Sequence, residues 1–435
     1  MPGDSDHLRP LDLPLAPEAV LTRWPEREPL AVLWSGGSAG PHARWTVLAR
    51  PSRSETATPG TAAEAKSFLD RWLCPSSGAM TTSSSLWKGI PDAEVPKFRG
   101  GVIVALSYDL GRVLEPAVGA SRHRGAPTCF ACECADAVIF DHARGRWWAL
   151  GEPPALAKGP VGEFMINGNP ELRVTAAAYA AGVDRVLEYI RAGDVYQVNL
   201  AHRTSARFSG SGRAFFVALV KEARPWYGAY VETGEGAVAS ASPELFLSYD
   251  PATRRLTTRP MKGTRPATRA GELETSEKDR AELNMITDLM RNDIGRVSEL
   301  GSVTVESARN FERHNTLVQT TSTVSGTLRP GLTIADALAA TFPGGSVTGC
   351  PKIRAMQIID ELEDSPRGFY CGSIGYVSRS GHAAFNIAIR TAVIRGGELT
   401  YHAGAGIVID SDPAAEWQET LDKAGILRRV AHGHA

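Results

Sequence analysis

What the sequence lacks excludes several classes of protein. The chain of 435 residues contains no apolar run approaching the ~18 residues that a membrane-spanning helix needs. Residues 1–19 lack a basic start followed by an apolar stretch, so we expect no signal peptide. The formal net charge is -1, which implies no general attraction to nucleic acid or to an anionic membrane. We therefore expect a cytoplasmic protein that binds neither.

Cysteine is also scarce, with six in the chain, and three of them cluster in the segment CFACEC. Cys129, Cys132 and Cys134 could indicate a metal site, but a second group of ligands at metal-site spacing is missing. The alternation of Phe130, Cys132 and Cys134 with other residues favours a strand instead. Buried free cysteines then act as small hydrophobic residues in a reducing compartment.

The composition is ordinary for a globular protein, with 43% hydrophobic and 22% charged residues. We predict two regions: a strand-rich N-terminal region at 1–165, made of short β-prone runs bounded by Gly, Pro or Asp, and a second domain at 170–430. The Pro/Gly-rich segment 151–164 is the expected crossover between them. Segments 51–65 and 76–85 are predicted to be mobile loops.

The second region carries clear helix signals. Thr175 can cap a helix that Gly193 ends, and Ser276 can cap another. Pro351 suits the first position of a third helix, and a last helix is expected after Pro413. Helices and β-hairpins mix without a regular βαβ alternation, so the predicted fold class is α+β.

Two of these helices carry acidic faces. Glu416, Glu419 and Lys423 lie at i, i+3 and i+7, and Asp279 and Glu282 lie at i and i+3, so each set shares one helix face. Carboxylates on two such faces could hold a hard cation such as Mg²⁺. Acidic pairs at this spacing are more often simply solvated, and the spacing leaves both interpretations open.

Longer blocks follow one another in a fixed order along the chain. They read GDVYQVN at 193–199, RPMKGTRP at 259–266, KDRAELNMITDLMRNDIGRV at 278–297, FPGGSVTGCPKIRAMQIIDELE at 342–363 and HAGAGIVIDSDPAAEWQETLDKAG at 402–425. These blocks resemble the signatures of the chorismate-utilising enzymes, which include anthranilate, aminodeoxychorismate, isochorismate and salicylate synthases. The resemblance covers about 172–427, and segment 100–115 resembles an N-terminal block of the amino-transferring members.

The resemblance implies a fold and a division of labour. We expect an α+β protein of two subdomains, with antiparallel sheets that face each other around an active-site cleft and helices outside. Region 1–165 would correspond to the N-terminal part of anthranilate synthase component I, and 170–430 to the chorismate-binding catalytic domain.

The resemblance also implies a metal ion and a set of substrate contacts. Glu282 and Glu419 would bind Mg²⁺, with Glu416 and Asp279 close by, and the ion would clamp the ring carboxylate of chorismate. The implied substrate contacts are Gln197, Gly263, Thr264, Tyr376, Arg390, Gly404, Ala405, Gly406 and Lys423, with Tyr376 and Arg390 at the enolpyruvyl carboxylate.

Two positions indicate which reaction the chain catalyses. Family members that add water carry a lysine base at the position of Gln197, and glutamine cannot take a proton at neutral pH. Members that make anthranilate carry a small residue at the position of Lys262, whereas aminodeoxychorismate synthases carry lysine. We therefore expect amination of chorismate at ring carbon 4, with Lys262 as nucleophile and Glu244 as acid/base. Gln319 departs from the family, where many members have a histidine.

The source of nitrogen is expected to be a second protein. The chain has no G-x-C-x-G segment of a glutamine amidotransferase, so a separate amidotransferase subunit would supply the ammonia. The product, 4-amino-4-deoxychorismate, would serve 4-aminobenzoate and folate synthesis or a related secondary pathway. The alternatives are anthranilate synthase component I, which Lys262 argues against, and a non-catalytic family member that acts as a binding partner.

Overall fold

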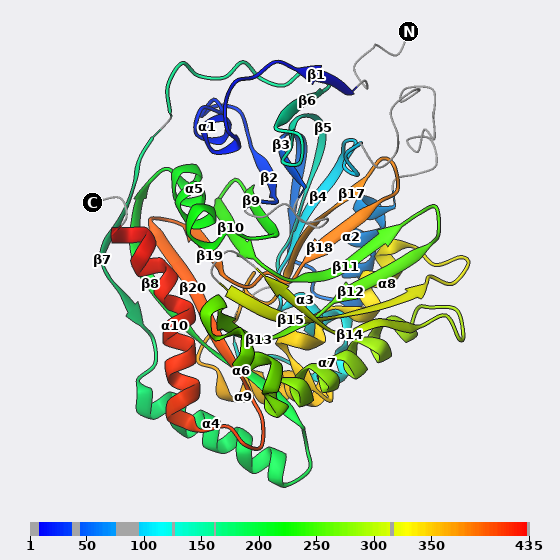
Figure 1. The fold of residues 1–435 in the computed structure, drawn as a ribbon, viewed down its shortest axis with the longest axis vertical. Helices are drawn as coiled ribbons and strands as arrows, with labels where there is room; N and C mark the ends of the chain where they lie inside the picture. Colours follow the sequence, from blue (N-terminus) through cyan, green and yellow to red (C-terminus); the bar gives the residue numbers. More distant parts are fainter. Residues whose placement is uncertain are drawn as a thin grey trace.

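The chain forms an α+β structure whose strands join in one antiparallel network, with helices on the outside (Figure 1). The structure, a computed structural model, describes residues 8–36, 44–74, 95–123, 127–160, 162–313 and 317–432. The predicted fold class is confirmed, since helices and hairpins alternate irregularly and every strand pair between described elements is antiparallel.

The long strands β3 (Trp45–Ala57) and β5 (Cys129–Asp141) link two halves of this network. One half runs in the order β7 (Phe164–Leu172), β8 (Gln197–Gly210), β20 (Glu398–Ile407), β19 (Thr391–Arg395), β10 (Gly236–Ser242), β9 (Tyr227–Glu232), β2 (Ala31–Trp34) and β3, while β6 (Arg146–Leu150) and β1 (Leu8–Leu11) extend it from β5. The short β16 (Gly349–Cys350) pairs with the start of β8.

The other half also starts from β5. It runs through β4 (Gly101–Leu106), β17 (Ser373–Ser378), β18 (Ala383–Asn386), β11 (Leu245–Asp250), β12 (Arg255–Arg259) and β15 (Leu317–Thr327), and β13 (Met261–Pro266) and β14 (Thr304–Arg313) both pair with β15. Because β2 pairs with β9 and β4 pairs with β17, regions 1–165 and 170–430 share one strand network.

Two sequence-based predictions in the N-terminal region have clear outcomes. The predicted cysteine strand is confirmed as β5, in which Cys129, Cys132 and Cys134 are buried. The predicted loop at 51–65 is wrong: β3 continues to Ala57 because its backbone pairs along the whole length of β5, and a helix capped by Thr61 follows. The predicted loop at 76–85 lies outside the described residues.

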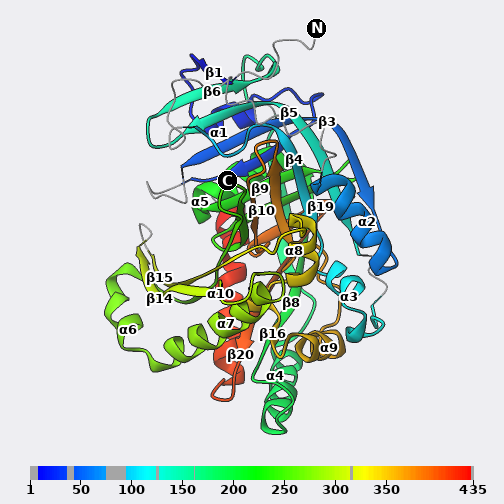
Figure 2. The ribbon, with the colours of Figure 1, turned by 90° about the vertical axis from the view of Figure 1, so that its right-hand side faces the viewer.

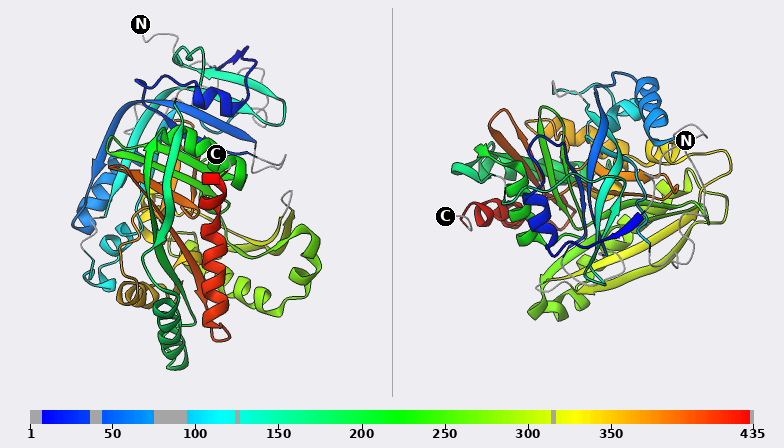
Figure 3. Two further views of the ribbon diagram at one scale, coloured as in Figure 1. Left: turned by 90° about the vertical axis from the view of Figure 1, so that its left-hand side faces the viewer. Right: turned by 90° about the horizontal axis from the view of Figure 1, so that it is seen from above.

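Helices lie on the outside of the network and pack against its strands, for example α10 against β20 (Figures 2 and 3). The described helices are α1 (Pro17–Thr22), α2 (Ala62–Leu73), α3 (Leu110–Leu114), α4 (Ala176–Arg191), α5 (Gly212–Ala223), α6 (Ala270–Thr275), α7 (Glu277–Gly295), α8 (Ile334–Thr341), α9 (Lys352–Leu362) and α10 (Pro413–His432). Thr175 and Ser276 cap α4 and α7 as predicted, while Pro351 is the residue before α9 rather than its first. No helix in the described part of the chain is long and apolar enough to cross a membrane.

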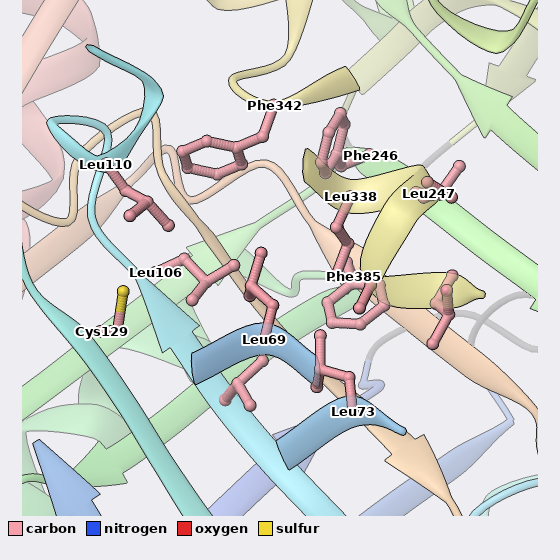
Figure 4. Close-up of a cluster of buried hydrophobic side chains, with 14 of the residues drawn as sticks. Leu69, Leu73, Leu106, Leu110, Cys129, Phe246, Leu247, Leu338, Phe342 and Phe385 are labelled. Carbon is pink, nitrogen blue, oxygen red and sulfur yellow. The ribbon is translucent and has the colours of Figure 1, made fainter. Parts of the chain in front are cut away.

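A large buried cluster of apolar side chains supports the segments that carry the site (Figure 4). Leu69 on α2, Leu106 on β4 and Phe385 on β18 belong to it, so both regions of the chain contribute. Phe246 on β11 packs edge-on against Phe342 at a ring distance of 6.2 Å. Because such aromatic contacts are well packed and hard to rearrange, the cluster anchors β11 to the segment that follows α8.

Candidate active site

Two glycines on β20 leave a shallow floor in the sheet. Gly404 pairs with Ala201 and Gly406 with Asn199, and directly opposed residues of an antiparallel pair share one face. A methyl group on Gly406 would lie 3.0 Å from Gln197 Nε2 and 3.2 Å from Lys262 Nζ. We call the surface around Gly404 and Gly406 the glycine floor, and here Lys262 on β13 of one half comes close to β20 and β8 of the other.

Lys262 reaches the glycine floor from β13. It lies opposite Thr320 of β15, whose hydroxyl donates a hydrogen bond to the Lys262 carbonyl. The strand bulges between Lys262 and Thr264, and Gly263 adopts a φ of 66°. A Cβ there would lie 2.8 Å from Asp279 Oδ1, so only glycine lets β13 pass this close to α7. Thr264 is exposed and lies opposite the buried Gln319.

Gln197 is fully buried with its polar atoms unused. It starts β8, it is 0% exposed, and neither Oε1 nor Nε2 has a hydrogen-bond partner in the described part of the chain. Leaving a buried carboxamide unpaired costs about 1–3 kcal/mol for each group. The arrangement therefore suits a bound molecule that supplies the partners.

Glu244 lies between β10 and β11 and is only 4% exposed. Ser346 Oγ donates a hydrogen bond of 2.6 Å to Glu244 Oε1. Burial raises the pKa of Glu244 to about 7, and the Ser346 hydroxyl, the Lys262 ammonium and the Met261 N–H limit that rise. A carboxyl group with a pKa near neutrality can both give and take a proton at physiological pH.

Glu419 on α10 acts electrostatically on Glu282 of α7 and on Glu416 of α10. Burial raises the pKa of Glu282, Lys262 and Lys278 oppose the rise, and Asp279 and Glu419 add to it. On α10, burial and the neighbouring Glu419 raise the pKa of Glu416. A 2.6 Å hydrogen bond from Ser411 opposes this rise. These effects place the carboxylates of α7 and α10 within electrostatic reach of one another.

Glu419 and Lys423 form an ion pair that also touches the glycine floor. Lys423 Nζ lies 2.7 Å from Glu419 Oε1 and donates to the Gly404 carbonyl at 2.9 Å. Burial would raise the pKa of Glu419, but Lys423, Lys262 and Lys278 together lower it, so this side chain is an anion at neutral pH. Lys423 thereby ties α10 to β20.

The acidic residues fit a metal ion only in part. Asp279 is engaged elsewhere, because its Oδ2 accepts a 2.9 Å hydrogen bond from Arg265. Within the described ranges, no three His, Cys, Asp or Glu side chains are close enough to form an all-protein metal site. Mg²⁺ usually takes only one or two carboxylates and completes its shell with water and substrate oxygens. Glu282 and Glu419 offer that kind of donor set, while Asp279 and Glu419 each already accept one hydrogen bond, from Arg265 and Lys423.

Arg390 provides an unpaired cation. It adopts a φ of 51° before β19, and no hydrogen bond or ion pair of its guanidinium occurs among the described residues. Burial lowers its pKa, with Tyr401 and Arg429 as its electrostatic neighbours. A half-buried guanidinium without such a partner suits a carboxylate ligand.

The structure does not bring Tyr376 to the glycine floor. Its ring packs edge-on against Phe98, at 5.6 Å, and lines a separate apolar cavity of about 160 Å³ with Trp34 and Trp226. The tyrosine at the floor is Tyr370, since a methyl group on Gly404 would lie 2.9 Å from its hydroxyl. Tyr370 and Tyr376 both lie in the segment GFYCGSIGY at 368–376. Only Tyr376 belongs to strand β17, whose pairing with β4 directs it away from the glycine floor.

Sequence reasoning also missed Asn199 and Ser346, which stand inside the quoted blocks. Strand alternation from Gln197 indicates that Asn199 faces the floor, but nothing local predicts that Ser346 meets a residue 102 positions away. The side chain of Ala405 points to the opposite face, where it packs with Ile407. Ala405 can therefore contribute only its backbone to the floor.

Comparisons with known proteins agree with one another. The profile of a family described as chorismate binding enzyme matches residues 45–429. The chain is 39% identical over 352 residues to aminodeoxychorismate synthase component 1 of Escherichia coli, covering 77% of each protein. It is 37% identical over 374 residues to anthranilate synthase component 1 of Pseudomonas putida, covering 77% of this chain and 76% of that one.

Among solved structures, anthranilate synthase component I from Streptococcus pneumoniae superposes with a TM-score of 0.74 at 30% identity, covering 88% of this chain and 92% of that chain.

Proposed function

The chain belongs to the chorismate-binding enzymes, and we propose that it replaces the 4-hydroxyl of chorismate with an amino group. The product is 4-amino-4-deoxychorismate, a precursor of 4-aminobenzoate. The observation that carries the proposal is Lys262 Nζ beside Gln197 at Gly406. Gln197 provides no base for activating water, while a lysine amine at the same place provides a nucleophile.

The reaction proceeds through two displacements. The neutral Lys262 amine attacks ring carbon 2, the two ring double bonds shift, and the C4–O bond breaks. Glu244 gives its proton to the departing hydroxyl, which leaves as water. Ammonia then attacks carbon 4, the double bonds shift back, and the C2–N bond to Lys262 breaks, while the Glu244 carboxylate takes up the proton released by the attacking nitrogen. Two steps with a covalent intermediate replace one difficult substitution.

Lys262 and Glu244 support each other in this scheme. A lysine is nucleophilic only when neutral, and Glu244 is an acid only when protonated. The charge of Lys262 acts on Glu244, so the two groups are near enough for the scheme to move one proton between them, and that transfer gives both required forms. Ser346 and Met261 hold the carboxyl group in place for this exchange.

The proposal includes Mg²⁺ held by Glu282 and Glu419. When bound, the ion neutralises the ring carboxylate of chorismate and orients the ring. Glu416, fixed by Ser411, lies within electrostatic reach of Glu419 and adds negative charge to the site. Lys423 keeps Glu419 next to the Gly404 carbonyl. Arg390 is available for a second carboxylate.

Glu419→Gln is expected to reduce turnover at least a hundredfold, because the amide removes one anionic ligand, while the melting temperature stays within about 2 °C. The measurement is the rate of chorismate consumption against Mg²⁺ concentration, with Glu188→Gln on the exposed face of α4 as the matched control. Full activity of the unaltered chain in excess EDTA would overturn the metal assignment.

A separate glutamine amidotransferase subunit supplies the ammonia in this proposal. The sequence contains no nucleophile segment for glutamine hydrolysis. The Escherichia coli relative carries the name component 1, which supports a second component for this chain too.

The test of the proposed function is product identification. The purified chain with chorismate, Mg²⁺ and ammonium is expected to give the 4-amino product, assigned by NMR, and to give none when glutamine replaces ammonium. A fluorescent 2-aminobenzoate product would favour anthranilate synthase, the activity of the Pseudomonas putida relative. No consumption of chorismate would favour a non-catalytic binding partner.

A further inference from the structure

Asn199 is a second buried carboxamide on the glycine floor. It lies two residues after Gln197 on β8, directly opposite Gly406 of β20, two strands that run side by side in Figure 1. The residue is 7% exposed, and its Nδ2 has no hydrogen-bond partner in the described part of the chain. Residues i and i+2 of a strand share a face, so Asn199 and Gln197 point to the same side.

The backbone of Asn199 is held firmly while its side-chain donor is free. Its N–H donates to the Thr348 carbonyl at 2.8 Å, and its carbonyl accepts from Arg367 at 2.6 Å. Arg367 is itself fixed by a buried ion pair with Glu363 and a 2.9 Å hydrogen bond to the Val347 carbonyl. The side chain therefore stands on a rigid support, as a residue that orients a ligand requires.

A structural role does not explain this carboxamide. A buried donor without a partner costs about 1–3 kcal/mol, and folded proteins keep few of them. The segment 344–348 lies beside Asn199 and carries Ser346, which holds Glu244. Asn199 thus lies on the side of the glycine floor that adjoins the segment holding Glu244.

We propose that Asn199 is a substrate-binding residue whose Nδ2 donates a hydrogen bond to an oxygen of chorismate on the side nearest Glu244. The ligand class follows from the donor, because an –NH₂ group needs an acceptor oxygen and the molecule carries carboxylate, ether and hydroxyl oxygens. The inference rests on the proposed function for the identity of the substrate, but not for the position at which nitrogen is added.

Removing the donor tests the proposal. Asn199→Ala is expected to weaken chorismate binding at least tenfold, measured by calorimetry with Mg²⁺ and without ammonium, and to lower kcat/KM by a similar factor. The melting temperature is not expected to fall, because Nδ2 has no hydrogen-bond partner among the described residues. Asn199→Asp, which has no donor and repels the anionic substrate, should weaken binding further.

Thr204→Val is the matched control on the same strand. Thr204 Oγ1 is also buried without a partner in the described part of the chain, but strand alternation places it on the face opposite Asn199. Its replacement is expected to leave binding and kcat/KM within twofold.

The outcomes separate this inference from the proposed function. Binding within twofold of the unaltered chain in Asn199→Ala would overturn the role of Asn199, whatever the melting temperature. Weakened binding together with a 2-amino product would support Asn199 and overturn only amination at carbon 4. Failure of the unaltered chain to bind chorismate would overturn both.

Discussion

Lys262→Ala is expected to lower formation of the 4-amino product about a thousandfold and to release some 2-amino product. Without the covalent step the activation barrier rises by several kcal/mol, and each ~1.4 kcal/mol is a tenfold change in rate. The same substitution uncovers ring carbon 2, which Lys262 otherwise occupies, so ammonia can attack there. Product analysis by NMR and the rate with ammonium as the nitrogen source are the measurements.

Lys262→Arg separates nucleophilicity from charge. Arginine keeps the positive charge beside Glu244 and Glu282 but stays protonated and cannot attack carbon 2. It is therefore expected to be nearly as inactive as Lys262→Ala, whereas Lys221→Ala on the exposed face of α5 should match the unaltered chain. Retained activity in Lys262→Arg, or an unchanged rate and product in Lys262→Ala, would contradict a covalent role.

Glu244→Gln is expected to lower turnover about 10²- to 10⁴-fold, the usual contribution of a general acid, and at the same time to stabilise the protein at pH 8. Burial raises the pKa of Glu244 from 4.5 to about 7, so the folded state binds this proton more tightly than the unfolded state. Between those values only the folded state is protonated, and stability falls as the pH rises. Above pH 7 the buried anion costs about 3 kcal/mol, at about 1.4 kcal/mol for each tenfold change in proton affinity.

Glutamine resembles the protonated acid and avoids that cost. The difference in melting temperature between Glu244→Gln and the unaltered chain should therefore be small at pH 4.5 and large at pH 8, since only the unaltered chain loses stability between them. Ser346 can rotate its hydroxyl to keep a hydrogen bond with the amide. Equal differences in melting temperature at both pH values would show that Glu244 is not a buried acid. Undiminished turnover would show that it is not the proton donor.

Local signals in the sequence were sufficient for the helices α4, α7, α9 and α10 and for the family. Thr175 and Ser276 cap helices because their hydroxyls accept hydrogen bonds from N–H groups three residues later, a contact that needs no distant partner. The cysteine strand followed from its period of two. The loop predicted at 51–65 failed because pairing with β5 outweighs the turn-forming residues of that segment.

The members of the site could be named from the sequence, but not all of their partners. Asp279 looks equivalent to Glu282 on the helix face. However, Arg265, 14 residues upstream, donates a hydrogen bond to Asp279 Oδ2. Tyr376 and Tyr370 are equally plausible by position in their block, and only the pairing of β17 with β4 separates them.

By itself, the sequence determined the α+β class, the capped starts of α4 and α7, the family and the residue types at positions 197, 244 and 262. Only the tertiary structure decided that β8, β20 and β13 meet, so that Gln197, Gly406 and Lys262 converge from segments up to 209 positions apart. It also decided that burial and Ser346 together set the proton affinity of Glu244. The physical reason is range: capping and periodicity act within a few residues, whereas burial, electrostatic neighbours and unpaired donors depend on what the folded chain brings from far away.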